Sequence, residues 1–223
     1  MSKTALRKQQ LIEKYKDEKV FVVPFSRTEE ILDGFHPITE KAYDKLVDVV
    51  IPKGKFILRS DAEEDMTFQQ IIPYVLVTDE AHEKFFATRR IQGESRLLGR
   101  LSLGIGGHIN PCDWRAANCA FFQTHREMVL RSMAREIREE MTGLEHVRKP
   151  RPYGTVRDLG SFTPDHVGIV FTMVAANPEE IGIRETNTLE PVWMTKQDLV
   201  RNYEKFESWA QMIIENMVIE KAA

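Results

Sequence analysis

Three acidic side chains lie close together in the segment 127–143, which reads EMVLRSMAREIREEMTG. Glu136, Glu139 and Glu140 are spaced i, i+3 and i+4, so in a helix with 3.6 residues per turn they share one face. Carboxylates so close repel one another. A hard divalent cation such as Mg²⁺, which binds oxygen ligands and bridges carboxylates to phosphates, would relieve that repulsion. The spacing therefore indicates a metal site. The alternative is a solvated acidic helix whose glutamates pair with neighbouring arginines.

Apolar residues occupy the other side of the same predicted helix. Val129, Met133, Ile137 and Met141 recur at helical spacing and would pack against a hydrophobic core. The helix would thus be anchored on one side while it presents its glutamates on the other.

The segment resembles the Nudix signature, G-x5-E-x7-R-E-U-x-E-E-x-G-U, in which U is a bulky aliphatic residue. Glu127, Arg135-Glu136, Ile137 and Glu139-Glu140 all match this signature in register. The closing glycine comes one residue late, at Gly143.

The opening glycine of the signature is displaced much further. Its best match, Gly107, lies twenty residues before Glu127 rather than six, which implies an insertion of fourteen residues at roughly 109–122. Because Trp114 and Phe121-Phe122 could stack on a base or anchor the loop, we expect the insertion to shape substrate choice and to leave the metal chemistry alone.

The resemblance implies a fold and an activity. The fold would be α/β, the Nudix α/β/α sandwich with a mixed central sheet. Residues 61–223 would form the Nudix domain with its C-terminal helix, and residues 1–60 an N-terminal extension packed on or beside it. The activity would be metal-dependent hydrolysis of a phosphoric anhydride (pyrophosphate) bond in a nucleoside diphosphate linked to another moiety.

The resemblance also implies roles for residues of the helix. Its three glutamates would hold Mg²⁺ or Mn²⁺, and Arg135 would keep the glutamate cluster in shape. Glu127 would orient Arg135 through a charge-assisted hydrogen bond. Glu127 has a second interpretation, because Thr124-x-x-Glu127 is a capping-box pattern at the start of a helix.

Further site residues are expected around the helix. In Nudix proteins another acid often comes from the loop before the closing strand, and Glu185 is the candidate for this metal ligand, with Glu190 behind it. The sequence leaves the general base open between a signature glutamate and the loop acid, because geometry decides before pKa. The predicted substrate-binding residues are Gly106, Gly107, His108 and Arg89.

Two other functions compete with hydrolysis. A non-catalytic Nudix-like module that binds a ligand or regulates has no need of all three carboxylates, so the intact R-E-x-x-E-E favours an enzyme. An isoprenoid diphosphate isomerase would need an activated cysteine in the site, whereas Cys112 and Cys119 both fall in the insertion. With His108 and His125 they form H-x3-C-x6-C-x5-H, whose spacing differs from that of common structural zinc sites, so we expect packed thiols.

The composition excludes several classes of protein. Of the 223 residues, 42% are hydrophobic, enough for a core, and 29% are charged. The net charge of −3 gives no reason to expect nucleic-acid binding. The chain has no run of eighteen apolar residues, and its charged N-terminus is unlike a signal peptide. We therefore expect a cytoplasmic protein with a small nucleotide-type substrate, no nucleic-acid or membrane partner, and a homodimer as an open alternative.

Several strands and helices would position these residues. The N-terminal extension, residues 1–60, could be a lid, a dimerisation element or a packed addition, and the sequence leaves these three alternatives open. Periodicity and turn signals predict strands at 21–25, 71–77, 84–89, 98–105, 154–161, 167–175 and 191–194, and helices at 4–18, after Thr39, and from Thr195 to Lys221.

Overall fold

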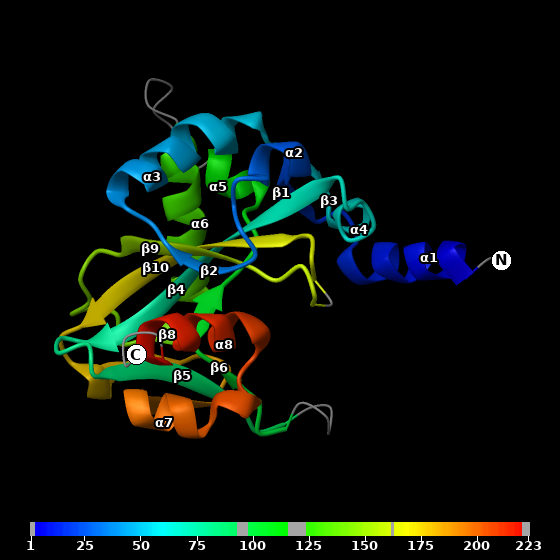
Figure 1. The fold of residues 1–223 in the computed structure, drawn as a ribbon. Coiled ribbons are helices and arrows are strands. Elements are labelled where there is room, and N and C mark those ends of the chain that lie inside the picture. Colours follow the sequence, from blue (N-terminus) through cyan, green and yellow to red (C-terminus); the bar gives the residue numbers. More distant parts are fainter. Residues whose placement is uncertain (1–2, 93–97, 116–123, 162, 220–223) are drawn as a thin grey trace.

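Two long strands, β4 (Phe68–Asp79) and β10 (His166–Ala175), lie side by side and parallel at the centre of a mixed sheet (Figure 1). The computed structural model describes residues 3–92, 98–115, 124–161 and 163–219. Both strands are buried along almost their whole length, as expected where helices cover both faces of a sheet.

Eight further strands complete this sheet within the described residues, and the main order is β12-β5-β4-β10-β9-β2. A separate two-stranded sheet joins β8 (Met141–Thr142) to β11 (Gly182–Ile183). The other strands of the main sheet are β1 (Lys19–Pro24), β2 (Gly34–Pro37), β3 (Lys55–Leu58), β5 (Lys84–Arg90), β6 (Leu101–Ser102), β7 (Gly104–Gly106), β9 (Arg151–Arg157) and β12 (Leu189–Thr195).

Helices cover both faces of the sheet, and Figure 1 shows α3, α5 and α6 above the central strands and α7 and α8 below them. The helices are α1 (Lys3–Tyr15), α2 (Phe25–Thr28), α3 (Glu40–Lys45), α4 (Arg59–Ala62), α5 (Pro111–Arg115), α6 (His125–Glu140), α7 (Lys196–Arg201) and α8 (Ser208–Ile214). Shorter helical turns are η1 (Leu46–Val50), η2 (Ile51–Lys53), η4 (Pro178–Glu180), η5 (Tyr203–Lys205) and η6 (Glu215–Ile219).

The two faces of the sheet carry separate hydrophobic cores, because consecutive strand residues point to opposite sides. Val75 of β4 belongs to the core that includes Val129 and Ile137 of α6. The next residue, Leu76, belongs to the other core, with Ile213 of α8. The predicted α/β/α sandwich with a mixed sheet is confirmed by this arrangement, as is the anchoring of α6 through its apolar side.

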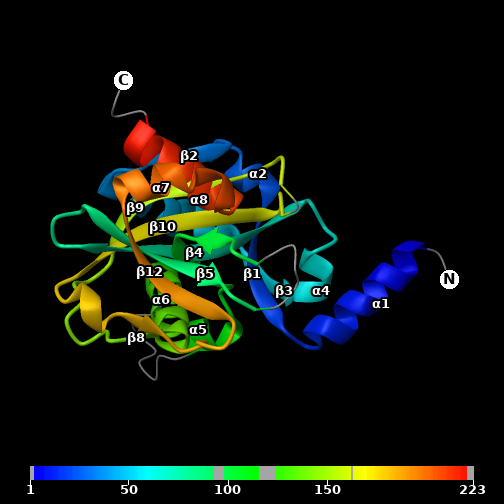
Figure 2. The ribbon, with the colours of Figure 1, turned by 90° about the horizontal axis from the view of Figure 1, so that it is seen from below.

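The N-terminal segment contributes strands to the same sheet. β1 pairs with β3 and with the first residues of β4, and β2 pairs with β9. Helix α1 lies to one side of the sheet in Figures 1 and 2, and Lys8 on it forms an ion pair with Asp61 of α4. A domain boundary at residue 60 stays a prediction.

The predicted helix from Thr195 to Lys221 is wrong as a single element. α7 ends at Arg201, and the next long helix, α8, begins only at Ser208. Between them Phe206 adopts an extended backbone conformation, forms a bridge to Leu101 and is fully buried. The apolar residues do recur at helical spacing, but burial of Phe206 beside β6 requires a break in the helix.

The predicted strand at 98–105 is also divided. β6 pairs with β5, whereas β7 pairs with β4, so the chain passes from one neighbouring strand to the other at Leu103. This change of partner places Gly106 and Gly107, at the end of β7, close to the start of β10 and to α6, where the candidate site lies.

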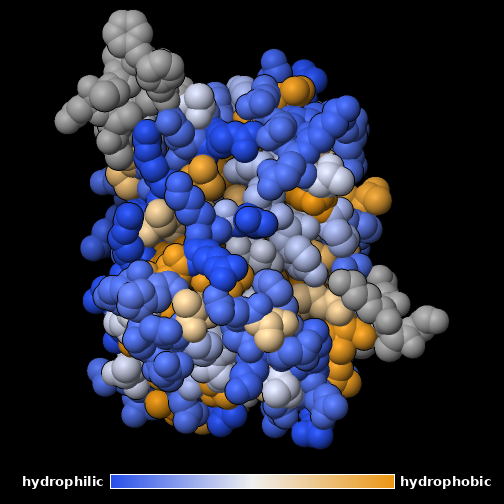
Figure 3. Space-filling view, turned by 90° about the vertical axis from the view of Figure 1, so that its left-hand side faces the viewer, coloured by the Kyte–Doolittle hydropathy of each residue, from blue (hydrophilic) through white to orange (hydrophobic). Residues whose placement is uncertain are grey.

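The surface on one side of the molecule is mainly hydrophilic, and its hydrophobic residues form small groups among polar ones (Figure 3). None of the helices in the described ranges has the length and apolar character needed to cross a membrane.

Candidate functional site

Arg135 is the best-connected side chain of the site. Its Nε and Nη2 donate to the two carboxylate oxygens of Asp113, each at 3.0 Å, and Nη2 also donates to the carbonyl of His108 at 2.9 Å. Its Nη1 donates to Glu136 at 2.6 Å and to Glu139 at 3.2 Å. These five bonds match the five N–H groups of a guanidinium, so Arg135 is held in one orientation. The Asp113 bonds, ahead of the attraction of Glu136, raise the pKa of Arg135.

Asp113, which holds Arg135, comes from the insertion and was missed as a site residue. Its side chain is 3% exposed, and Oδ2 also accepts from the backbone N–H of Asn110 at 2.8 Å, which fixes the first turn of α5. The sequence did carry a signal, because Asp113 is the one acidic residue between 109 and 122. A partly buried arginine favours a carboxylate partner, and the insertion offers no other.

Glu127 does not take the predicted role of orienting Arg135. Its carboxylate accepts from the backbone N–H of Thr124 at 3.2 Å and completes a capping box at the start of α6. It also forms an ion pair with Arg131, one helical turn away, at 3.5 Å. The capping interpretation of Thr124-x-x-Glu127 is therefore correct. Thr124 and Arg131 both lie within four residues of Glu127, and Arg135 is already bound by Asp113.

Gly106, the last residue of β7, and Gly107 allow the chain to approach β4 and α6 closely. A Cβ on Gly107 would overlap the carboxyl group of Glu136, and one on Gly106 would lie 2.6 Å from the carbonyl oxygen of Pro73. Any side chain at Gly107 would therefore displace the first glutamate of the cluster. Gly107 therefore lies directly against Glu136 of α6, and only a residue without a side chain fits at this position.

A cavity of about 560 Å³ opens beside the C-terminal end of α6. The pairing of β8 with β11 brings the loop after β11 to this cavity, and the N–H of Arg184 donates to the carbonyl of Glu140 at 2.8 Å. Glu185 therefore lies in the same cavity wall as Glu139 and Glu140. Its charged lining residues are Arg90, Arg100, Glu139, Glu140, Arg184, Glu185 and Glu207.

Glu140 has the most unusual titration behaviour of these glutamates. Burial, followed by repulsion from Glu136, Glu185 and Glu139, raises the pKa of Glu140 to about 7. Glu140 nevertheless lines an open cavity and is exposed to solvent there. Water therefore screens part of the burial effect, and repulsion among the four carboxylates is the contribution that a cation would remove.

Arg89 and Glu190 lie apart from this cluster. They belong to the neighbouring strands β5 and β12 and form an exposed ion pair with each other at 3.3 Å. The next residue along β5, Arg90, lines the cavity instead, because adjacent strand residues face opposite sides. The structure therefore points to Arg90 rather than Arg89 as the strand residue at the cavity.

His108 faces a second cavity, of about 440 Å³, which shares Tyr74, Gly106 and Glu207 with the first. Burial, followed by the positive charge of Arg59, lowers the pKa of His108 to about 3, so its ring is neutral at physiological pH. At the junction of the two cavities, burial raises the pKa of Glu207.

The predicted packed thiols are corrected in part. Cys112 is exposed rather than packed, and Cys119 lies outside the described residues, as do Phe121 and Phe122. The ring of His125 packs against Trp114, with centroids 4.8 Å apart. The insertion thus contributes Asp113 to the site and Trp114 to packing beside α6.

Comparisons with known proteins agree with this architecture. Protein YmaB of Bacillus subtilis (strain 168) is 29% identical over 168 residues, which cover 70% of this chain and 75% of YmaB. The structure of Tm1382, a protein proposed to be a Nudix hydrolase, is similar with a TM-score of 0.71 and 23% identity, over 91% of this chain and 100% of Tm1382. A NUDIX hydrolase from Alicyclobacillus acidocaldarius gives a TM-score of 0.52 and 14% identity, over 68% of this chain and 91% of the other. No family model matches the sequence.

The chain has the Nudix fold, an α/β/α sandwich around a mixed sheet. The expectation drawn from the signature-like segment is thereby confirmed at the level of the fold.

Proposed function

We propose that this protein is a metal-dependent hydrolase that cleaves a phosphoric anhydride (pyrophosphate) bond in a nucleoside diphosphate linked to another moiety. The observation that carries the proposal is the concentration of carboxylates around Glu140. Glu136 and Glu139 of the same helix and Glu185 of the loop after β11 all act on the Glu140 carboxyl group and raise its pKa. Such perturbed groups in a cavity are typical of functional sites.

The residues present fit a hard divalent cation. Mg²⁺ and Mn²⁺ prefer oxygen ligands, and the donors here are all carboxylates. Arg135 neutralises part of the charge on Glu136 and Glu139, whereas Glu140 and Glu185 repel each other across the cavity wall. We propose that Glu136, Glu139, Glu140 and Glu185 hold the cation. When bound, it would neutralise phosphate charge and lower the pKa of a water molecule.

The protein itself would position the substrate. Arg90, Arg100 and Arg184 line the cavity, and guanidinium groups suit phosphate oxygens. Arg100 donates to the carbonyls of Glu204 and Phe206, at 2.9 and 3.2 Å, so its guanidinium is held in place before a substrate arrives. In the proposed reaction water attacks one phosphorus, the bond from that phosphorus to the bridging oxygen breaks, and two phosphomonoesters result.

Arg135 would act as a positioning residue. It binds Asp113 and the His108 carbonyl on one side and Glu136 and Glu139 on the other. It therefore fixes the spacing of two glutamates that would otherwise separate by repulsion. Groups held in advance of reaction stabilise charge in the transition state without reorganisation.

A hydrolysis screen tests the proposal and separates it from the binding-module alternative. Purified protein would be incubated with ADP-ribose, dinucleoside polyphosphates, sugar nucleotides and nucleoside triphosphates, with Mg²⁺, Mn²⁺ or a chelator. We expect cation-dependent cleavage of at least one diphosphate-linked nucleoside. Tight binding of such a compound without cleavage would instead favour a ligand-binding module.

A further inference from the structure

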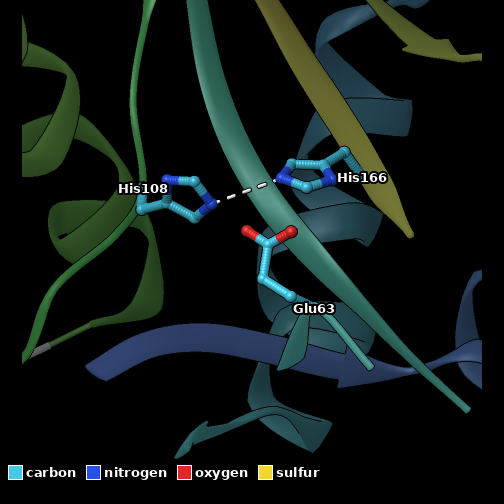
Figure 4. A group of neighbouring side chains, drawn as sticks. All are labelled: Glu63, His108 and His166. Carbon is cyan, nitrogen blue, oxygen red and sulfur yellow. Dashed lines mark hydrogen bonds between the residues drawn. The ribbon is translucent and has the colours of Figure 1, made fainter. Parts of the chain in front are cut away.

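Three side chains of types that bind metals converge beside the second cavity. They are Glu63, which follows α4, His108, which follows β7, and His166, the first residue of β10 (Figure 4). One ligand atom from each side chain lies within 4.8 Å of the other two. Segments far apart in the sequence therefore meet at one point with two imidazoles and one carboxylate.

The two imidazoles meet edge to face, with their ring planes 75° apart and their Nε2 atoms within hydrogen-bond distance of each other. The Nε2 atoms of His108 and His166 are 3.3 Å apart. In a tetrahedral zinc site with Zn–N bonds of about 2.0–2.1 Å, two nitrogen ligands are separated by roughly 3.3–3.4 Å. The two rings therefore need no large movement to share one cation.

His166 has the hydrogen-bond partner that metal-binding histidines usually have. Its Nδ1 lies 3.1 Å from Oδ1 of Asp165, a residue that is 5% exposed. A proton on Nδ1 directed at this carboxylate leaves a lone pair on Nε2, which in this structure accepts from Nε2 of His108 and which a cation would take up in place of that bond. A carboxylate behind the ring also fixes its orientation, as in many zinc sites.

His108 sits in the same hydrogen-bond network. Gln70 donates through Nε2 to Oδ2 of Asp165 at 2.6 Å, so its Oε1 faces Nε2 of His108 at 2.8 Å. In this state Nε2 of His108 carries the proton. Cation binding at Nε2 therefore requires the other neutral tautomer, with the proton on Nδ1, and the loss of the Gln70 bond.

Arg59 is the group that competes with a cation at this point. Its Nε donates to Oε1 of Glu63 at 3.4 Å, and its Nη1 donates to both oxygens of Glu18, at 3.1 and 3.2 Å. Its positive charge is thus offset by Glu18 as well as by Glu63, while Asp165 adds a third carboxylate nearby. His108 and His166 also line the second cavity with Thr163 and Trp209, which gives a cation a route from solvent.

We propose that Glu63, His108 and His166 form a second metal site, for Zn²⁺ or a cation of the same class, separate from the glutamate cluster of α6. Two nitrogens and one oxygen suit Zn²⁺, whereas Mg²⁺ prefers oxygen ligands alone. Three protein ligands would leave a fourth position of a tetrahedral cation for water or another ligand. Because the carbonyl of His108 accepts from Arg135, a cation on its ring would link Glu63 and His166 to the residue that positions the glutamates.

The test measures metal binding by the full chain and needs no activity. Protein stripped with a chelator would be titrated with Zn²⁺, and with Co²⁺ as a spectroscopic probe, in the presence of excess Mg²⁺ to occupy the glutamate cluster. We expect one Zn²⁺ per chain and the Co²⁺ absorption of a four-coordinate site with nitrogen ligands. Absence of stoichiometric Zn²⁺ binding by the wild-type protein would overturn the proposal whether or not any variant folds.

Variants identify the ligands. His166→Ala and His108→Ala should weaken Zn²⁺ binding more than Asp165→Asn, for which loss of the supporting carboxylate predicts about 10–100-fold weaker binding. The controls are His146→Ala, an exposed histidine, and Glu140→Gln in the glutamate cluster, both of which should bind Zn²⁺ as the wild type does. Circular dichroism would check that each variant folds. Zinc binding that is lost in Glu140→Gln and kept in His166→Ala would contradict the assignment.

Discussion

Asp113 holds Arg135 through two parallel hydrogen bonds of 3.0 Å, although the two residues belong to different helices and are 22 positions apart. The aspartate is buried and the arginine reaches from it to Glu136 and Glu139. The insertion that separates the opening glycine from Glu127 thus contacts the glutamate cluster through Arg135. Our expectation that the insertion leaves the metal chemistry alone stays a prediction, and this contact is an argument against it.

Replacement of this carboxylate gives the first prediction. Asp113→Asn should lower the free energy of unfolding by about 2–5 kcal/mol, because it leaves the Arg135 charge without its buried partner. It should also lower kcat, since the glutamates lose their support. Urea unfolding and steady-state kinetics would measure the two effects.

Glu127→Gln is the matched control for Asp113→Asn. Glutamine also completes a capping box, and the lost ion pair with Arg131 is an exposed one, worth about 0–1 kcal/mol. We therefore expect near wild-type stability and kcat. A loss of activity as large as that of Asp113→Asn would show that Glu127, not Asp113, supports Arg135.

Gly107 gives the second prediction. Gly107→Ala places a methyl group where the carboxyl group of Glu136 lies, so Glu136 or the loop must move. Since a displacement of about 1 Å can cost 10²-fold in rate, we expect a strong fall in kcat. In Gly160→Ala, the control, the new methyl group would meet Asp158 at an ordinary 3.6 Å and activity should be retained. Equal activity of the two variants would contradict the close approach.

The raised pKa of Glu140 gives a pH dependence. Its pKa rises from 4.5 to about 7 on folding, so between these values the metal-free native state binds more protons than the unfolded state. Stability then falls as pH rises through this window. With a chelator present, wild-type stability relative to Glu140→Gln should therefore decrease from about pH 4.5 to about pH 7 and level off above it. Urea unfolding at several pH values measures this difference, and a difference independent of pH would contradict a raised pKa of Glu140.

The helix that carries the cluster could be predicted from the sequence because its signals are local. The apolar spacing of Val129, Met133 and Ile137 fixes the buried side, and the Thr124 cap fixes the start. The sheet was predictable for a similar reason, since β4 and β10 are long apolar segments bounded by turns.

The partner of Arg135 depended on contacts that sequence spacing does not encode. Glu127 matched the signature, but its cap partner Thr124 is three residues away and always within reach, whereas Asp113 becomes available only when α5 packs on α6. The meeting of Glu63, His108 and His166 is of the same kind, because three separate segments of the fold produce it. The break at Phe206 likewise depends on a contact with β6.

The measurement that tests the central claim most directly is the kcat of Glu139→Gln and Glu140→Gln with Mg²⁺ or Mn²⁺, on the substrate that the hydrolysis screen identifies. Each substitution keeps the shape of the side chain and removes its charge. Since charged groups at a reacting centre contribute about 3 kcal/mol, we expect kcat to fall at least ~10²-fold with the fold retained. Glu83→Gln, an exposed glutamate paired with Lys196, is the control and should keep wild-type kcat. Full activity in both Glu139→Gln and Glu140→Gln would contradict metal-dependent hydrolysis at this cluster.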